Sequence, residues 1–310
     1  MDDDLTPGPV AVVINPSKFD DDADVRAQVE QACADREWPA PAFYETTVED
    51  PGVGQAQQAL ADGASLVISI GGDGTTRAVA EAMADSGVPL GIIPAGTGNL
   101  LARSLATPLD LAKALDVVFD GRTRAIDIGE LSADGRESEA FLVMAGLGMD
   151  ADVMAGVDDT LKKQIGWVAY LVSGLRAVFG KGFRVRLDAD GRTRIGQHAR
   201  TVLVGNVGQL QGGVMLMPEA LIDDGKLDVL LASPKGVLGW GALIADIASR
   251  HRRGHRGVRR VQAETVTIGV RQPVEAQIDG DPIGAVRTLV CRVRPEALIV
   301  RVPPADPDEG

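Results

Sequence analysis

The sequence has few of the residues that define disulfide-rich or membrane-spanning proteins. Its 310 residues include only two cysteines, Cys33 and Cys291, which are isolated and lack Cys-x-x-Cys spacing. This argues against a disulfide framework and a cysteine-based zinc site. No apolar run reaches the roughly 18 residues of a bilayer-spanning helix, and residues 1–4 are acidic where a signal peptide would be basic. We therefore expect a cytoplasmic protein whose membrane contact is at most peripheral.

Positive charge is scarce as well. Lysine and arginine together number 31 against 44 aspartates and glutamates, which gives a formal net charge of -13. Such a chain has no overall basic field for nucleic-acid phosphates, so we expect no nucleic-acid partner. A hydrophobic content of 45% is enough for well-formed cores, and the length favours about two domains.

One stretch, residues 66–79, organises the rest of the chain. A run rich in β-branched residues leads into Gly71-Gly72-Asp73-Gly74, and helix-forming residues follow from Thr75. This order predicts a strand, a tight loop and a helix N-terminus. Glycines let backbone N–H groups converge on an anion, and the helix N-terminus favours negative charge. The loop is therefore predicted to bind phosphate.

Asp73 is the exception within this loop. A carboxylate among phosphate-binding amides is repulsive unless a cation lies between them, so its presence indicates Mg²⁺ that bridges to a nucleotide. The alternative is a Gly-Asp-Gly turn that only caps an ordinary helix.

Strands and helices alternate through residue 120, which predicts a parallel sheet. The strand at 90–93 leads into a second glycine-rich loop, Pro94-Ala95-Gly96-Thr97-Gly98-Asn99. Loops at the carboxyl ends of parallel strands form the ligand crevice, so the two loops should share one edge. Asn15-Pro16-Ser17, after the first strand, is either a further nucleotide contact or a plain turn.

The other strands of this sheet are expected at 9–14, 42–46 and 66–70, and the helices near 24–36, 53–62 and 76–84.

The pattern changes near Thr123. Short alternating runs follow, with probable hairpins at Asp134-Gly135 and Asp190-Gly191, which predicts a mostly antiparallel second domain. A helix at 161–178 is apolar almost all round, so it is either buried or faces a hydrophobic ligand. We divide the chain into a nucleotide-binding domain at 1–123 and a β-rich domain at 124–294. Residues from about 295 to 310 are candidates to return to the first domain.

Five motifs together resemble a known family. Their order and spacing are similar to those of the diacylglycerol kinase catalytic-domain family, which includes bacterial soluble diacylglycerol kinases and is related to sphingosine and ceramide kinases. NAD kinases and phosphofructokinases carry loops like the first motif, but the full set covers essentially the whole chain. The motifs are Gly71-Gly72-Asp73-Gly74-Thr75, Pro94 to Asn99, Gly146-Leu147-Gly148-Met149-Asp150, Leu221 to Asp228, and Ile278-Asp279-Gly280-Asp281.

The resemblance implies an α/β nucleotide-binding domain like that of NAD kinase and diacylglycerol kinase, followed by an antiparallel β-sandwich. It implies a lipid kinase that uses ATP and Mg²⁺ and transfers the γ-phosphoryl group to a lipid hydroxyl, most directly that of diacylglycerol, to give phosphatidic acid. It also implies an ATP site of small and polar residues in the first domain. These are Asn15, Pro16, Thr46, Thr47, Gly71, Gly72, Asp73, Gly74, Thr75, Thr76, Arg77, Gly96, Thr97 and Asn99.

Two acidic motifs complete the implied site. The turn after Leu221 resembles a structural Mg²⁺ site: Asp224 would bind through its carboxylate, Leu221 and Lys226 through carbonyls, and Asp223 would reach Asp73 through water. Asp279-Gly280-Asp281 resembles the family's Asp-Gly-Glu, which supplies the base that takes the lipid hydroxyl proton. We favour Asp279 as this base, with Asp281, one methylene shorter than Glu, as the alternative. Without the resemblance, the residues of each of these two motifs would indicate only a turn.

The motifs show one departure from the family's pattern, and the sequence contains three rival signals. Leu100 stands where many relatives carry Asp, so one link of the family's acidic network is missing or replaced by another side chain. Residues 146–151 match a Gly-x-Gly-x-x-Ala dinucleotide fingerprint, but the helix and the strand with its acidic end that should follow are absent. Residues 174–182 lack the spacing of a P-loop, and His251 and His255 have no acidic neighbour to complete a metal site.

The acceptor and the partners are less defined. A sphingoid base, phosphatidylglycerol, a polyprenol-like alcohol or NAD could replace diacylglycerol, and a nucleotide- or lipid-binding regulator without turnover is a further alternative. Six arginines within residues 249–260 either anchor the protein to anionic lipid or form a solvated loop. We expect a lipid substrate at the membrane surface, and edge strands of the second domain make a homodimer plausible.

Overall fold

The computed structural model forms two compact units. The first comprises Met1–Ile128 and Glu296–Gly310, and the second Gly129–Pro295. The change in sequence pattern near Thr123 precedes this boundary because one strand, β5 (Arg122–Ala133), runs through it. The predicted helix at 161–178 and most of the arginine-rich segment lie outside the described residues. The structure describes residues 5–148, 182–210, 214–233 and 258–304.

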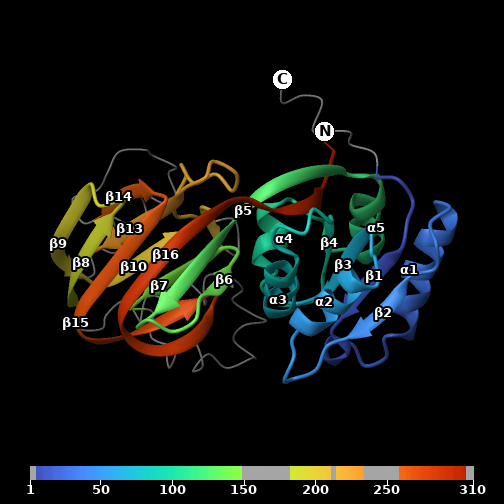
Figure 1. Cartoon of the computed structure of the whole chain (residues 1–310), viewed down its shortest axis with the longest axis horizontal. Coiled ribbons are helices and arrows are strands. Elements are labelled where there is room, and N and C mark those ends of the chain that lie inside the picture. Colours follow the sequence, from blue (N-terminus) through green and yellow to red (C-terminus); the bar gives the residue numbers. More distant parts are fainter. Residues whose placement is uncertain (1–4, 149–181, 211–213, 234–257, 305–310) are drawn as a thin grey trace. The chain divides into compact units, whose positions relative to one another are not determined.

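The first unit is built on a parallel sheet, which confirms the prediction (Figure 1). Its strand order is β2-β1-β3-β4-β16, and each neighbouring pair in it is parallel. β1 and β3 are buried along their whole length because a parallel sheet is covered on both faces. The strands are β1 (Val10–Ile14), β2 (Ala42–Glu45), β3 (Leu66–Gly71), β4 (Leu90–Pro94) and the last part of β16 (Asp281–Val302).

Helices connect these strands. Residues of α1 and α5 share one hydrophobic core with β1 and β3, while α2 contacts α3. α3 begins at Asp73, three residues before the predicted start, with Gly72 as its N-cap. This start places Asp73 in the first turn, where the helix dipole favours a carboxylate. The helices are η1 (Pro16–Lys18), α1 (Ala23–Asp35), α2 (Val53–Ala61), α3 (Asp73–Met83), α4 (Leu100–Ser104) and α5 (Leu111–Asp120).

Arg301 joins the end of the chain to this unit. Its side chain is buried, and its guanidinium donates to the carbonyl oxygens of Val118 (2.9 Å) and Phe119 (3.3 Å) at the C-terminal end of α5. It also donates to the hydroxyl of Thr123 at 2.7 Å. The free carbonyls and negative dipole end of a helix stabilise a buried cation. The contact explains how β16 is held beside β4 and α5.

The second unit is antiparallel, as predicted. β15 pairs with β7, β8 and β16, and the β8–β9 and β5–β6 hairpins turn through Asp-Gly pairs with positive φ at both residues. Alternate residues of these strands form a single core. The strands are β6 (Glu139–Phe141), β7 (Met144–Leu147), β8 (Phe183–Ala189), β9 (Thr193–Ala199), β10 (Thr201–Gly205), β11 (Gln209–Leu210), β12 (Val214–Met215), β13 (Leu227–Ala232), β14 (Val258–Ala263) and β15 (Thr265–Ile278).

Three further points bear on function. Gly146 lies in β7 between the antiparallel strands β10 and β15, which is not the βαβ context of a dinucleotide fingerprint. In the described ranges, no helix has the length and hydropathy to span a bilayer. Both cysteines are free and buried, and burial raises the pKa of Cys33 to about 11 and that of Cys291 to about 12.

Candidate active site

The first glycine-rich loop joins β3 to α3. Gly71 ends the strand, and Gly72 caps the helix without a side chain of its own that could bond to the amides of the first turn. A Cβ on Gly71 would lie 2.6 Å from the Cβ of Thr75, so the strand approaches the helix too closely for a side chain at this position. The helix end therefore presents backbone N–H groups, which suits an anion.

The second glycine-rich loop packs directly against the first. The N–H of Ala95 donates to the carbonyl oxygen of Gly71 at 2.7 Å. A Cβ on Gly96 would lie 2.7 Å from the Cα of Gly72, a distance that real Cβ atoms do not show. The parallel pairing of β3 and β4 brings both loops to one edge of the sheet, which confirms the predicted shared edge.

The carboxylate of Asp73 joins the two loops. Its Oδ2 accepts the N–H of Asn99 at 2.8 Å, and its Oδ1 accepts the N–H of Leu100 at 2.5 Å. These amides start α4, so the negative charge lies against the positive end of that short helix. The sequence indicated that a cation must offset this charge, but the second loop already offers it two amide donors. Direct contact of Asp73 with Mg²⁺ stays a prediction.

Asn99 closes the second loop on itself. It is buried, with a left-handed φ of +50°, and its side-chain amide exchanges two hydrogen bonds with the backbone of Gly96, at 2.9 and 2.8 Å. The presence of Leu100 in place of Asp leaves the contact between Asp73 and the second loop intact, because Asp73 bonds to the backbone of residue 100 and not to its side chain.

Asn15 and Lys18 extend this edge from β1. The Asn15 side chain donates to the hydroxyl of Thr75 at 3.2 Å and accepts from the backbone and hydroxyl of Ser17. The Cε of Lys18 would lie 3.7 Å from a Cβ on Gly72. Sequence reasoning missed Lys18, although a lysine directly after the strand and its Asn-Pro-Ser turn was the available signal. It brings a cation to the glycine-rich loops.

The other predicted nucleotide contacts differ in their environments. Thr46 is buried at the end of β2, where its N–H donates to the carbonyl oxygen of Ile14. Thr47 is exposed, and its hydroxyl accepts from the N–H of Asp50 in a local turn. Thr97 is exposed at the tip of the second loop. Pro16 starts η1, Gly74 and Thr76 lie in the first turn of α3, and Arg77 is half-buried on that helix.

In the second unit, Asp279 is a buried carboxylate that binds backbone amides. It accepts the N–H groups of Leu142, Val143 and Met144, each at 2.9 Å. Its own N–H donates to the carbonyl oxygen of Met144 at 2.8 Å. Asp279 and Gly280 have φ of +49° and +96°, which forms a two-residue hairpin turn between β15 and β16. The carboxylate thus fixes the hairpin against the segment before β7.

Asp281 has a different environment from Asp279. It begins β16 directly after the turn and is exposed, whereas Asp279 is 9% exposed. The preferred base, Asp279, therefore has most of its lone pairs engaged by amides, and the alternative, Asp281, has its carboxylate at the surface.

The predicted metal turn precedes β13. The N–H of Lys226 donates to the Asp224 carboxylate at 3.1 Å, and Gly225 has a φ of +68°, so this segment is a tight turn. Asp223 and Leu221 are exposed. Within the described segments, no group of three or more His, Cys, Asp or Glu side chains is placed to hold a metal ion. The Mg²⁺ site, which relies partly on carbonyl oxygens, stays a prediction.

Asp228 is a buried acid that sequence reasoning did not select, although it lies in the fourth motif. It accepts from Gln262 at 3.1 Å. Burial raises the pKa of Asp228 above its ordinary value, and the like charges of Asp224 and Glu219 raise it further. The hydrogen bond from Gln262 lowers this pKa and so opposes the shift. The turn and β13 therefore form an acidic region.

We predict that Gly96→Ala destabilises the first unit. The added Cβ would meet the Gly72 Cα, and overpacking of this kind costs about 1–3 kcal/mol. Thermal unfolding should show a lower Tm. Gly196→Ala is the control, because a Cβ there meets no atom within 4 Å. An unchanged Tm for Gly96→Ala would contradict the close contact between the loops.

We also predict that Asp228→Asn raises the Tm at neutral pH. A carboxyl group whose pKa is higher in the folded than in the unfolded protein stabilises the fold at pH values below the unfolded pKa, near 3.8. This stabilisation is lost as the pH rises through the pKa of the folded protein. Neutral Asn avoids this loss, so the gain in Tm should shrink as pH falls toward about 4. The measurement is a Tm series across pH with EDTA present.

The control for Asp228→Asn is Glu137→Gln, which changes the net charge equally at an exposed site. It should leave the Tm series unchanged. A lower Tm for Asp228→Asn at neutral pH would show that the carboxylate stabilises the fold in its charged form.

Comparisons with known proteins identify relatives of both units. Residues 9–131 match the family model "Diacylglycerol kinase catalytic domain", and residues 143–302 match "YegS C-terminal NAD kinase beta sandwich-like domain". A "Probable lipid kinase YegS-like" protein of Pseudomonas aeruginosa is 34% identical over 81% of each chain. A protein of the same name from Pseudomonas fluorescens is 35% identical over 81% of this chain and 82% of its own.

Solved structures show the same fold. A structure described as a diacylglycerol kinase from Bacillus anthracis superposes with a TM-score of 0.72 at 21% identity, over 96% of this chain and 97% of its own. Yeast NADH kinase complexed with NADH gives a TM-score of 0.54 at 10% identity, over 98% and 86%. These likenesses bear on the fold, whereas the family models span both units. The chain belongs to the family of lipid kinases defined by the diacylglycerol kinase catalytic domain, in its YegS-like form with a β-sandwich C-terminal domain.

Proposed function

We propose that this protein transfers the γ-phosphoryl group of ATP to the hydroxyl of diacylglycerol. The observation that carries the proposal is the clamp formed by Asp73, which holds two glycine-rich loops together at the carboxyl edge of β3 and β4. Phosphoryl transfer depends mainly on positioning and on charge neutralisation, and this edge offers both. Membership of a lipid kinase family implies ATP as the co-substrate and a lipid as the acceptor.

The residues of the first unit have distinct roles in this proposal. The amides of the first turn of α3 bind phosphate oxygens, and Lys18 neutralises part of their charge. Asn15 holds Thr75 at the same edge. Asp73 does not contact phosphate directly but keeps the second loop in place.

Mg²⁺ fits the donors of the second unit. Asp224, the carbonyls of Leu221 and Lys226, and Asp223 offer the oxygen ligands that this ion prefers. Burial is the main cause of the raised pKa of Asp228, and the like charges of Asp224 and Glu219 add to it; a cation at the turn would offset these charges. A Mg²⁺ bound with the nucleotide in the first unit would supply neutralisation of phosphate charge, whereas an ion at this turn would hold the turn.

We assign proton acceptance to Asp281 and a positioning role to Asp279. Three amide bonds to Asp279 support the positioning role, since they hold the turn that carries Asp281. A base needs a lone pair within reach of the substrate hydroxyl, which favours the exposed carboxylate. In phosphoryl transfer this group needs only to orient the hydroxyl and take its proton late.

The first experiment is transfer of label from [γ-³²P]ATP, with Mg²⁺, to separate acceptors in detergent micelles. We expect labelled phosphatidic acid from diacylglycerol and much less label on sphingosine, phosphatidylglycerol or NAD. If another acceptor is labelled more strongly, that acceptor replaces diacylglycerol as the proposed substrate. ATP binding without transfer to any acceptor would favour a regulator without turnover.

The second experiment compares Asp281→Asn with Asp279→Asn. Loss of a general base typically costs about 10²-fold or more in rate, so Asp281→Asn should lower kcat by that factor with an unchanged Tm. Asp279→Asn should lower the Tm, since an amide N–H₂ would face backbone donors and each lost charged bond costs roughly 1.5–3 kcal/mol. Ordinary turnover by folded Asp281→Asn would return the role of base to Asp279.

A further inference from the structure

The outer face of the second unit has a hollow lined by arginines. It measures about 550 Å³ and crosses four neighbouring strands, β9, β8, β15 and β16. In one row, Gly196 pairs with Arg186, Arg186 with Gly269, and Gly269 with Thr288. A Cβ on Gly196 would meet no atom within 4 Å, and one on Gly269 only a backbone oxygen at 4.0 Å. The two glycines therefore leave the floor open on both sides of Arg186.

Four arginines surround this floor. Arg184 and Arg186 point outward from β8, because Val185 and Leu187 between and after them are buried in the core. Arg271 of β15 and Arg287 of β16 line the same hollow, as does His198, the register partner of Arg184. We call the hollow with these four arginines the arginine groove.

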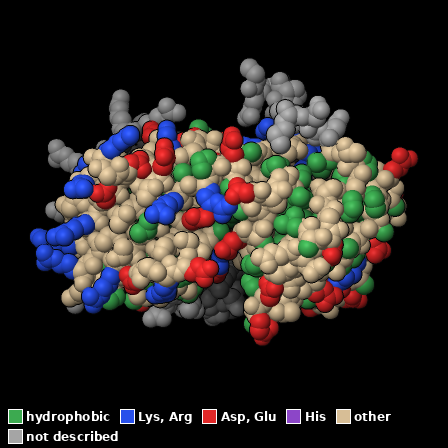
Figure 2. All heavy atoms as spheres, viewed as in Figure 1, with side chains coloured by type: hydrophobic (Ala, Val, Ile, Leu, Met, Phe, Trp, Pro, Cys, Tyr) green, Lys and Arg blue, Asp and Glu red, His purple; other side chains and the backbone are tan. Residues whose placement is uncertain are grey.

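The arginine groove carries unbalanced positive charge. Among the described residues that line it there is no aspartate or glutamate, and the nearby carboxylate of Asp134 accepts the backbone N–H groups of Arg287 and Thr288. Among the described residues, none of the four guanidinium groups forms an ion pair or a hydrogen bond, unlike Arg26 and Arg36, which pair with acids at 2.5–2.8 Å. In Figure 2, blue side chains gather over the part of this unit where Figure 1 labels β8, β9 and β15. A chain of net charge -13 thus has a local cationic face.

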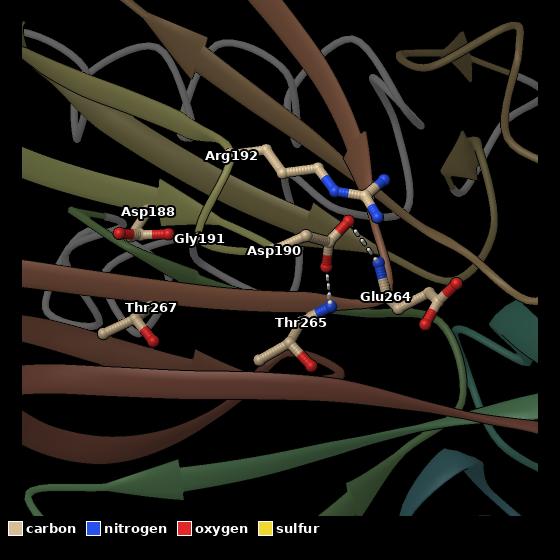
Figure 3. Close-up of a pocket in the computed structure, with 7 residues that line it drawn as sticks. All are labelled: Asp188, Asp190, Gly191, Arg192, Glu264, Thr265 and Thr267. Carbon is tan, nitrogen blue, oxygen red and sulfur yellow. Dashed lines mark hydrogen bonds between the residues drawn. The ribbon is translucent and has the colours of Figure 1, made fainter.

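A neighbouring hollow shows the contrast. It measures about 420 Å³ and holds Arg192 among the acids Asp188, Asp190 and Glu264 (Figure 3). The carboxylate of Asp190 there accepts the N–H of Thr265 at 2.8 Å, so it serves the hairpin turn. Arg194 on the same hairpin pairs with Asp188 at 2.9 Å. Arg192 in this second hollow and Arg194 beside it therefore lie close to acids, in contrast to the arginines of the arginine groove.

We propose that the arginine groove binds the phosphate headgroups of an anionic bilayer. A guanidinium binds phosphate through paired N–H donors, and four of them on one sheet face can engage neighbouring headgroups together. The groove is open and about 14 Å wide at the usual strand spacing, so it can lie against a surface. A lipid kinase must reach its acceptor at such a surface, and attraction of about 1 kcal/mol per charge is enough for reversible contact.

The test is co-sedimentation of the full chain with vesicles, without ATP, so its outcome is independent of the catalytic proposal. Vesicles of phosphatidylcholine mixed with phosphatidylglycerol are compared with phosphatidylcholine alone. Removing two charges near the surface should weaken binding about 30-fold, so Arg184→Gln with Arg186→Gln should show this loss. The control pair, Arg192→Gln with Arg194→Gln, makes the same change in net charge at arginines that face acids, and should retain most of the binding.

Two further arms complete the test. Arg271→Gln with Arg287→Gln should reproduce the loss, which covers the case in which the first pair fails to fold. Inorganic phosphate and glycerol phosphate are titrated against the wild-type chain, and we expect only weak binding. Unchanged vesicle binding in both groove pairs would overturn the proposal, and so would an equal loss in the control pair. If the chain binds a free phosphate tightly but does not bind vesicles, the proposal is wrong and the ligand of the groove is a soluble phosphate.

Discussion

The carboxylate of Asp73 is the constraint on which the edge of the first unit that carries the two glycine-rich loops depends. By accepting two amides at the start of α4, it fixes the second glycine-rich loop against the first. The close approach then determines the residue types around it. A Cβ on Gly98 would lie 2.6 Å from Asp73 Oδ2, and one on Gly96 would meet Gly72. The glycines are thus needed for packing between the loops, apart from any role in binding an anion.

The second unit uses the same device for another purpose. Asp279 also accepts backbone amides, but these come from a segment that precedes it by about 135 residues, and it does so from a hairpin turn. Aspartate tolerates the positive φ that the turn requires, and its carboxylate satisfies buried donors. The turn and the functional interpretation of this motif are therefore compatible. One aspartate stabilises the turn, and the next one, Asp281, is left at the surface.

The sheet and the shared edge of the loops were predictable because they follow from local patterns. Apolar runs of strand length and the glycine-rich loops each carry their own signal. The partners of Asp73 and Asp279 were not predictable, since they depend on backbone from distant parts of the chain. Lys18 had a local signal in its place after the first strand, but its proximity to Gly72 appears only when β1 and β3 pair. The start of α3 was misplaced because its glycines gave a loop signal within the first turn.

The distribution of charge limits how a chain of this composition can approach an anionic surface. Beyond the Debye length, about 8 Å at physiological ionic strength, a net charge of -13 is largely screened, and within it local charges decide the interaction. Faces rich in acid are then repelled and the arginine groove is attracted, so contact through the groove would select an orientation as well as supply affinity. Phosphorylation of a neutral lipid hydroxyl adds negative charge to the surface. Contact through the groove would therefore strengthen where the product accumulates, and it would weaken as salt screens the arginines.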